Sequence, residues 1–205
     1  MRSASEWLTV LTSCGVRPST AARWADAFAA EVQPEKFSKG AVEIPMFLGQ
    51  VLHESGLLER MEEGLSYSTP ANIRRVWPSR FPTDASAQPF VRNPRDLANK
   101  VYGGRLGNTG PNDGWTYRGS GPIQVTGKEN FAALERATKV PFVSNPDLLR
   151  QPGAEALRAC VAWWEGHVPD AVMGDVVRVR KAVNGGTIGL DEAVRLTDRA
   201  RKALV

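Results

Sequence analysis

Apolar side chains recur at intervals of three and four residues through much of this chain, which is the spacing of one face of an α-helix. They do so in residues 21–32, behind a Pro18-Ser19-Thr20 sequence that is typical of a helix start. Residues 44–52 repeat the pattern, with Pro45 in the first turn, where a helix tolerates proline. Alternating apolar and polar runs of about five residues do not recur. The periodicity therefore predicts a mainly helical protein and argues against a β-sandwich.

Helices are also predicted toward the carboxyl end, at residues 129–138, 154–164, 175–184 and 190–204. Between the two groups of helices, five prolines interrupt residues 66–99, which indicates short helices and turns. Residues 103–121 hold seven glycines, and we expect a long ordered loop or a small hairpin there. Functional residues are often carried on loops of this kind.

The length of 205 residues is enough for one good hydrophobic core, with two lobes at most. We therefore expect residues 1–205 to form a single domain, and a monomer by default. Apolar residues at 42% and charged residues at 23% are ordinary for a soluble globular protein. The net charge of +4 indicates an acidic partner, for which bacterial wall polymers and nucleic acids both qualify.

The amino terminus and the cysteines bear on the compartment in which the protein is made. The first residues contain no apolar run of signal-peptide length, and no stretch approaches the roughly 20 apolar residues of a membrane span. We therefore expect synthesis in a cytoplasm. Cys14 and Cys160 are too few for a disulfide framework and lack metal-ligand spacing, so we expect buried free thiols rather than a bridge.

Two acidic residues, Glu54 and Glu63, are candidates for acid and base catalysis. Glu54 lies at the edge of the apolar stripe of residues 44–52, where packing is expected to meet a cleft. An unbroken helix would place Glu63 on the opposite face and about 13.5 Å further along the axis. The helix must therefore end between them, and Gly56 is the residue suited to end it. Glu59 and Glu62 are rivals for the second role, and a solvated acidic edge is the alternative for all three.

Residues 118–127 form a glycine-rich polar segment in which backbone can approach a ligand closely. Gln124 and Thr126 would share a face if the segment is extended, and Asn130 joins them if a helix starts near Gly127. An amide and a hydroxyl on one face suit a sugar and a water molecule. A purely structural glycine turn is the alternative.

Three other chemistries fit the sequence poorly. Residues 121–128 resemble a phosphate-binding loop but have one residue too many, and Glu129 follows where serine or threonine is needed. His53-Glu54 lacks the second histidine of a zinc protease helix, because Leu57 occupies that position. Gly119-Ser120-Gly121 is not the nucleophile elbow of an acyl-transfer enzyme. We therefore expect neither a metal ion nor another cofactor.

Cleaving a glycosidic bond needs an acid, a base and a positioned water, and the segments above offer all three. Their order along residues 7–200 resembles glycoside hydrolase family 19, and in particular its bacteriophage endolysin branch. The resemblance is carried by His53 to Gly56, Glu63 to Ser68, Ala98 to Tyr102 with Arg105 and Gly107-Asn108, Asp113 to Asn130, Asn145 to Leu149 and Asn184 to Leu190.

The resemblance implies a role for each site residue. Glu54 would be the general acid, Glu63 the general base and Thr126 the hydroxyl that holds the attacking water. The positions expected to contact substrate are His53, Tyr67, Tyr117, Arg118, Gln124, Asn130 and Asn184. The family inverts configuration, which implies carboxyls about 6.5–9.5 Å apart with water between them. Its fold is mainly α, an α+β lysozyme-like arrangement of two helical lobes with a small β element beside the cleft.

The sequence departs from the family pattern at three places. Ser120 replaces an arginine of the glycine-rich segment, and Leu57 replaces the second glycine after His53-Glu54-Ser55. The arginine expected after residues 184–190 is displaced, with Ala193 at its position and Arg195 two residues beyond. These changes bear on substrate contacts and polymer preference, and they leave the proposed acid, base and water-holding residues in place.

The leading interpretation is an endolysin that hydrolyses β-1,4 bonds of peptidoglycan and lyses its host, reaching the wall from the host cytoplasm through a holin. A chitinase acting on chitin is the alternative enzyme. The third interpretation is a non-catalytic basic module that binds the cell wall or nucleic acid. Its charges would be those of Arg178, Arg180, Lys181, Arg195, Arg199, Arg201 and Lys202. The terminal segment 190–204 is also a candidate for transient contact with an anionic envelope.

Overall fold

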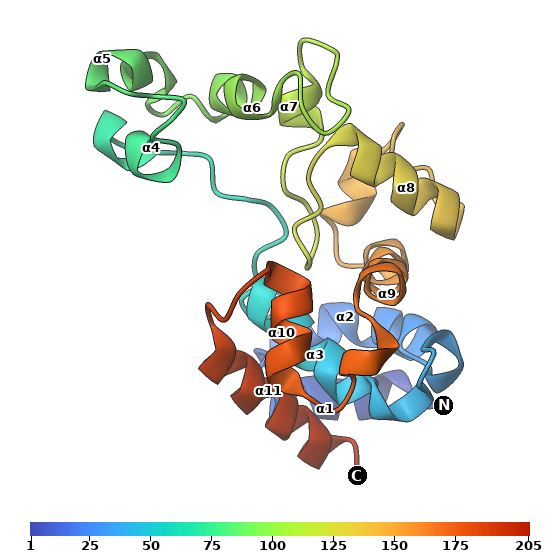
Figure 1. The fold of residues 1–205 in the computed structure, drawn as a ribbon. Helices are drawn as coiled ribbons and strands as arrows, with labels where there is room; N and C mark the ends of the chain where they lie inside the picture. The colour runs from blue at the N-terminus through green and yellow to red at the C-terminus, as the bar shows by residue number, and fades with distance from the viewer.

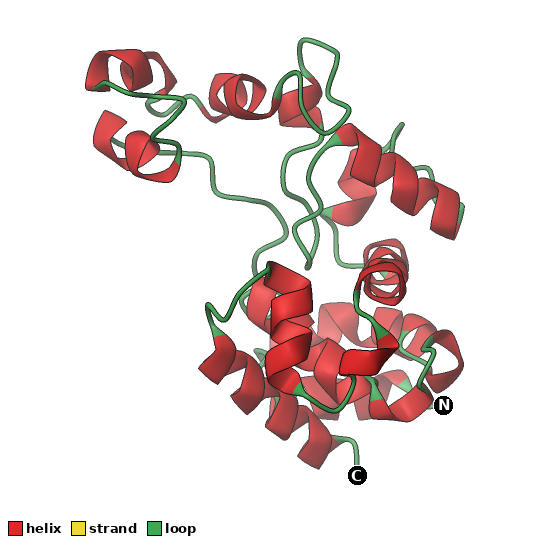
Figure 2. Ribbon diagram, viewed as in Figure 1, coloured by secondary structure: helices red, strands yellow, loops and turns green.

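The computed structural model describes all 205 residues as eleven α-helices joined by loops and short 3-10 turns, without a strand (Figures 1 and 2). The helices are α1 (Ala4–Ser13), α2 (Pro18–Glu31), α3 (Ile44–Glu54), α4 (Pro70–Val76), α5 (Asp84–Ala87), α6 (Pro94–Tyr102), α7 (Asp113–Thr116), α8 (Lys128–Thr138), α9 (Ala154–His167), α10 (Val176–Asn184) and α11 (Leu190–Ala203). The predicted mainly helical class is confirmed.

The lower lobe in Figure 1 is formed by α1 to α3 together with α9 to α11. Helix α3 lies at its centre, packed against α11. Ile44 and the seven residues from Met46 to Leu52 are all buried, and Pro45 between them is partly exposed. The 27 residues of this core include Trp7, Trp24 and Phe47, all nearly inaccessible to solvent. The burial explains why residues 44–52 are apolar apart from Gln50, and it fixes the helix that carries Glu54.

The upper lobe begins with α4 to α7, of which α4, α5 and α6 start within the proline-interrupted residues 66–99 (Figure 1). Thr69, Thr83 and Asn93 accept hydrogen bonds from backbone N–H groups of the first turns of α4, α5 and α6, which stabilises these short helices. A small core around Ile73, Phe81 and related side chains holds them together. A separate core around Phe131 and Phe142 packs beneath α8.

The small β element expected beside the cleft is reduced to two isolated antiparallel bridges. One joins Glu62 to Ser120 and the other joins Ser120 to Val125. The glycine-rich loop of residues 103–121 also contains the short helix α7, which the glycine content did not predict. Pairing is too short to form strands, but it places the segment after Glu62 directly against the segment around Ser120.

Cys14 and Cys160 are unpaired and buried, which confirms the expected free thiols. Burial raises the pKa of the Cys14 thiol to about 11, so it is protonated at neutral pH. None of the helices combines the length and the apolar character needed to cross a membrane.

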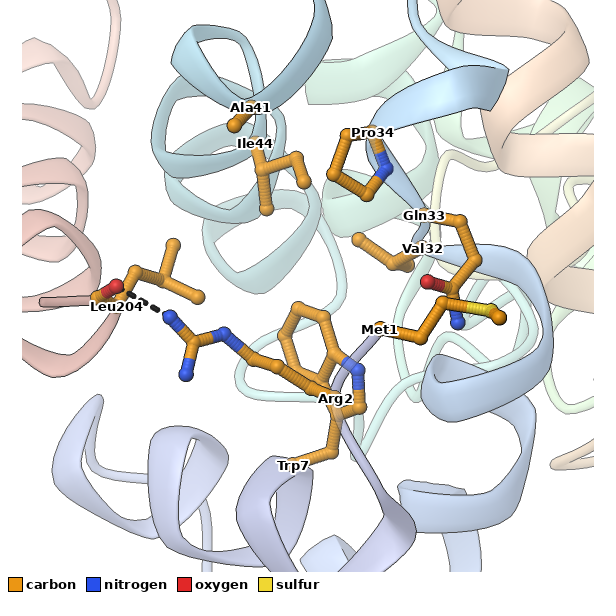
Figure 3. A pocket seen from close by; sticks show the side chains of 9 residues that line it. All are labelled: Met1, Arg2, Trp7, Val32, Gln33, Pro34, Ala41, Ile44 and Leu204. Atoms are coloured by element: carbon orange, nitrogen blue, oxygen red, sulfur yellow. Dashed lines mark hydrogen bonds between the residues drawn. The ribbon is translucent and has the colours of Figure 1, made fainter.

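A mainly apolar pocket of about 330 Å³ lies at the amino terminus (Figure 3). Its walls include Trp7, Val32 and Ile44, and the Arg2 guanidinium donates to the Leu204 carbonyl across it (Figure 3). That contact ties the start of the chain to the end of α11. The pocket shares no lining residue with the polar cleft described below.

Candidate active site

Helix α3 ends at Glu54, as the spacing of the two carboxylates predicted. The reversal uses three consecutive residues with positive φ, at 56° for Gly56, 63° for Leu57 and 65° for Leu58. The Ser55 hydroxyl accepts a hydrogen bond from the Leu58 N–H at 2.8 Å, which closes the turn. Leu57 therefore adopts a left-handed conformation that glycine, the family's residue there, adopts without steric cost.

Glu63 returns on a segment that pairs with the glycine-rich loop. Its backbone N–H donates to the Gly119 carbonyl at 3.0 Å, and its Oε1 accepts from the Gly119 N–H at 2.6 Å. Its Oε2 accepts from the Tyr102 hydroxyl at 2.7 Å. Burial and the nearby carboxylate raise the pKa of Tyr102, so its hydroxyl remains a hydrogen-bond donor over the physiological pH range.

Glu54 and Glu63 line the same cleft, a cavity of about 320 Å³ without a hydrophobic side chain in its lining. The lining residues are His53, Glu54, Arg60, Glu62, Glu63, Gly64 and Gln124. The two proposed catalytic carboxylates thus reach one cleft from different segments of the chain. Polar walls of this kind suit a hydroxyl-rich carbohydrate.

Arg180 is the principal site residue that the sequence analysis missed. From the sequence it is only one charge of a basic binding module, but its side chain is 3% exposed and forms an ion pair with Glu54 Oε1. The guanidinium also donates to Gln50 Oε1 at 3.0 Å and to the Ile188 carbonyl at 2.8 Å. A signal was present, because Arg180 shares helical spacing with Val176, Val179 and Val183 and so lies on the apolar face of α10.

His53 is held beside Glu54 by the start of α11. Its Nδ1 lies 2.8 Å from Glu192 Oε2, and its ring packs against Gly189. A methyl group on Gly189 would come within 2.2 Å of His53 Nε2, so only glycine fits there. His53 lines the cleft, and its contact with substrate stays a prediction.

The segment is not extended at Gln124, whose φ of 54° is left-handed, so the condition under which Gln124 and Thr126 would share a face is not met. Its Nε2 donates to the Gly121 carbonyl at 3.0 Å, and the side chain lines the cleft. The Thr126 hydroxyl donates to the Gln124 carbonyl at 3.1 Å but is not in the immediate lining of the cleft. Asn130 is exposed and donates to the Thr126 carbonyl at 2.7 Å, so it supports the backbone of the proposed water-holding residue.

Two of the predicted substrate-contacting residues are placed behind the cleft surface. Tyr117 is buried against Phe131, and its hydroxyl donates to the Val143 carbonyl at 3.0 Å. Arg118 is buried, forms an ion pair with Glu62 and lies 3.9 Å above the ring of Trp115. Neither residue is in the lining of the cleft, and each holds the glycine-rich loop through its contacts with other segments.

Tyr67 and Asn184 lie outside the immediate lining of the cleft. Tyr67 packs edge-on against Trp77, with ring centroids 5.6 Å apart, and burial together with Glu63 raises its pKa. Asn184 is exposed at the end of α10 and donates to the Ile188 carbonyl at 3.1 Å. It therefore fixes the loop whose carbonyl also binds Arg180.

The rival carboxylates have other partners. Glu59 accepts hydrogen bonds from Arg17 at 2.9 Å and Thr20 at 2.6 Å, and these contacts lower its pKa to about 2. It is absent from the cleft lining. Glu62 does line the cleft but forms an ion pair with Arg118. No three histidine, cysteine or acidic side chains lie together as ligands for a metal ion.

Comparison with known proteins decides the family. No family model matches the sequence. A protein of Haemophilus influenzae described as "Glycosyl hydrolase family 19 domain-containing protein" is 35% identical over 158 residues, which cover 74% of this chain and 74% of that protein. The chain belongs to glycoside hydrolase family 19. A shorter similarity, 33% identity over 64 residues, links 28% of this chain to 24% of "Chitinase 8" from Oryza sativa subsp. japonica.

Solved structures of family 19 proteins share the fold. Chitinase C from Streptomyces griseus HUT6037 superposes with a TM-score of 0.59 and 19% identity, covering 98% of this chain and 76% of that one. A class IV chitinase from Zea mays gives a TM-score of 0.52 and 16% identity, over 100% of this chain and 82% of that one. The predicted helical architecture is therefore shared with family 19 structures.

The displaced family 19 arginine is not restored by Arg195. That side chain is exposed on α11 and pairs with Glu192 at 3.5 Å, while Ala193 is fully buried. The guanidinium that pairs with Glu54 is that of Arg180, on α10.

Proposed function

We propose that this chain is an endolysin, a family 19 hydrolase that cleaves β-1,4 glycosidic bonds of the peptidoglycan glycan strand with inversion of configuration. The observation that carries the proposal is that Glu54 and Glu63 come from separate segments and line one polar cleft. An inverting reaction needs one carboxylic acid to protonate the leaving oxygen and one carboxylate to activate water.

Glu54 is the proposed general acid. Its Oε1 is held by Arg180, whereas Oε2 makes no hydrogen bond within the protein. The free oxygen is therefore available to carry a proton to the glycosidic oxygen, while the anchored oxygen fixes the direction in which the carboxyl points. The side chain is 28% exposed, which leaves access from the cleft.

Glu63 is the proposed general base. One hydrogen bond on each oxygen, from Gly119 and Tyr102, orients the carboxylate and leaves further lone pairs for a proton from water. Thr126 is the proposed water-holding residue. Because its hydroxyl donates to the Gln124 carbonyl, its own lone pairs remain free to accept from a water molecule.

Peptidoglycan is preferred over chitin on two grounds. The motifs between His53 and Leu190 resemble those of the endolysin branch, and the net charge of +4 favours an anionic polymer. A specific observation favours chitin as the second candidate, because the comparison proteins with printed activities are called chitinases.

Parallel assays separate the two substrates. The purified protein should reduce the turbidity of outer-membrane-permeabilised Gram-negative cells, and the Glu54→Gln and Glu63→Gln variants should each lose at least about 100-fold in rate. Colloidal chitin is the parallel substrate. Release of soluble chitin fragments without any clearing of cells would assign a chitinase instead.

The reaction products would define the bond. Mass spectrometry of released muropeptides identifies whether the new reducing end is on muramic acid or on glucosamine. Proton NMR of the first-formed anomer tests inversion. An initial product of retained configuration would rule out the two-carboxylate mechanism in its inverting form.

The expected route to the wall has a separate test. Lysis by the cytoplasmically expressed protein should depend on co-expression of a membrane-permeabilising holin. Lysis without it would show that the protein reaches the wall by another path.

The non-catalytic binding module remains the competing class. If Glu54→Gln left lysis intact while charge reversal on α11 abolished it, binding alone would account for the effect. The charges of α11 are partly compensated, since Arg201 pairs with Asp198 at 3.0 Å and Arg195 with Glu192. We nevertheless propose transient contact of this helix with an anionic envelope, which requires that neutralising Arg195, Arg201 and Lys202 weakens killing of intact cells from outside.

A further inference from the structure

Almost every charged side chain that lines the cleft has a partner inside the protein. The pairs are Glu54 with Arg180, Glu62 with Arg118, His53 with Glu192, and Glu63 with Tyr102 and Gly119. Arg60 differs from all of these. It lines the same cleft, is exposed, and its guanidinium has no hydrogen-bond or ion-pair partner.

The position of Arg60 is nevertheless defined. Its backbone N–H donates to the Ser55 carbonyl at 2.8 Å, which fixes the residue just after the left-handed turn. Its guanidinium lies over Gly56, where an added methyl group would come 3.0 Å from Nε and 3.3 Å from a terminal nitrogen. Gly56 therefore serves two purposes, since it ends α3 and leaves room for the guanidinium that lines the cleft.

A free guanidinium on a defined backbone is a site for a carboxylate, which it binds through two parallel hydrogen bonds. The carboxylates of Glu54 and Glu62 are each offset by one buried arginine, whereas that of Glu63 has only neutral donors, so the rest of the cleft keeps a negative charge that disfavours anions. An anionic substituent on the substrate is thus repelled elsewhere and accommodated at Arg60. Charge of both signs in one cleft selects where such a substituent lies.

The two candidate polymers differ in this respect. Chitin is a chain of neutral N-acetylated sugars, whereas peptidoglycan carries carboxylates on the peptide stems attached to alternate sugars. We propose that Arg60 binds a stem-peptide carboxylate and so determines the preference for peptidoglycan over chitin. The proposal rests on the proposed function, because it assigns a specificity residue to the same cleft.

A binding experiment tests the proposal without turnover. In a Glu54→Gln background, the affinity for purified sacculi is compared with that for sacculi whose carboxylates have been converted to neutral amides with carbodiimide and methylamine. Arg60→Gln should weaken binding to native sacculi about tenfold and leave binding to amidated sacculi within twofold. Arg60→Lys keeps the charge but loses the planar guanidinium. Its affinity for native sacculi should lie between those of the parent and Arg60→Gln.

Arg136→Gln is the matched control, because it removes an equal charge from an exposed position on α8 that lies outside the cleft lining. It should weaken binding to native sacculi less than twofold. The difference in affinity for native sacculi between Arg60→Gln and its parent should also shrink as the NaCl concentration rises from about 0.05 to 0.5 M, because salt screens exposed charges.

Kinetics of the otherwise wild-type protein give the second readout. The ratio of kcat/KM for sacculi to kcat/KM for neutral chitohexaose should fall about tenfold in Arg60→Gln, mainly through KM. Equal losses on both substrates, or equal weakening on native and amidated sacculi, would overturn the role of Arg60. Failure of the wild-type protein to digest sacculi at all, with chitohexaose cleaved, would instead overturn the proposed function.

Discussion

The proposed base Glu63 and the loop residue Gly119 are joined in both directions. The backbone of Glu63 donates to Gly119, and the backbone of Gly119 donates to the Glu63 carboxylate at 2.6 Å. The contact also leaves no space beside Gly119. A methyl group there would lie 3.1 Å from Glu63 Cβ, 3.2 Å from its Cδ and 3.1 Å from Gln124 Oε1.

Gly119→Ala is therefore expected to displace the Glu63 carboxylate while leaving the fold intact. A shift of this kind costs about 10- to 100-fold in kcat, because the base no longer meets the water at the productive distance. Gly166→Ala is the matched control, since no atom lies within 4 Å of the added methyl group in α9. Rates on permeabilised cells and melting temperatures would be measured for both. A Gly119→Ala enzyme with wild-type kcat would show that this contact does not position the base.

Tyr102→Phe removes the hydroxyl that donates to Glu63 Oε2 at 2.7 Å. We expect kcat to fall about tenfold, because hydrogen bonds to charged groups contribute roughly 1.5–3 kcal/mol and one of two orienting bonds is lost. Since burial and Glu63 raise the pKa of Tyr102, the alkaline limb of the pH–rate profile should be the same in both proteins. A rise in KM with kcat unchanged would indicate instead that Tyr102 contacts substrate.

Arg180→Lys keeps a positive charge near Glu54 but cannot reproduce three directed contacts. The guanidinium binds Glu54, Gln50 and the Ile188 carbonyl, and its side chain is 3% exposed. We expect a loss of about 2–4 kcal/mol in the free energy of unfolding and at least a tenfold loss in kcat. Urea unfolding would measure the first quantity.

The control for Arg180→Lys is Arg178→Lys, an exposed position on the same helix. It should change the free energy of unfolding by less than about 0.5 kcal/mol. Equal stability of the two variants would mean that the contacts of Arg180 add little to the fold.

The sequence predicted those parts of the site that depend on local structure. Apolar spacing located α3, and the nine-residue separation of Glu54 and Glu63 required a helix end between them, which lies at Glu54. The tolerance of glycine for positive φ identified Gly56 as a residue of the reversal. It did not predict that Leu57 and Leu58 would also adopt positive φ. A tight reversal held by the Ser55 hydroxyl imposes those conformations on residues that rarely adopt them.

The partners of the carboxylates depend on contacts between distant parts of the chain, and local spacing does not encode them. Tyr102 reaches Glu63 from α6, 39 residues away in sequence, and Arg180 reaches Glu54 across 126 residues. Because charged side chains are usually exposed, the sequence alone predicts that Arg180 lies on the surface. Tyr117 differs from its prediction in the opposite direction. It belongs to a motif that resembles a substrate-binding segment, but its side chain is buried in the hydrophobic core.

Glu31 gives a test of pH-dependent stability away from the cleft. Its carboxylate, 2% exposed, joins α2 to Arg158 on α9 at 2.7 Å and to Lys36 at 2.6 Å. Burial raises the pKa of Glu31, but the hydrogen bonds and charges of Arg158 and Lys36 outweigh it and hold the pKa below its ordinary value of 4.5. A carboxyl with a lowered folded-state pKa stabilises the fold above its unfolded pKa, and the contribution is lost as pH falls through the folded value.

Glu31→Gln should therefore lower the free energy of unfolding at pH 7 by about 1–3 kcal/mol, less than for a fully buried pair because Arg158 and Lys36 are partly exposed. The difference from wild type should shrink as pH falls below about 4.5, because the carboxyl of the unfolded state protonates there first, and it should disappear once pH is below the lowered native pKa. Denaturant unfolding between pH 7 and pH 3 would measure this difference in the free energy of unfolding. Glu35→Gln is the control, because Glu35 is exposed and has no side-chain partner. A difference that stays constant or grows in acid would contradict the ion-pair origin of the lowered pKa.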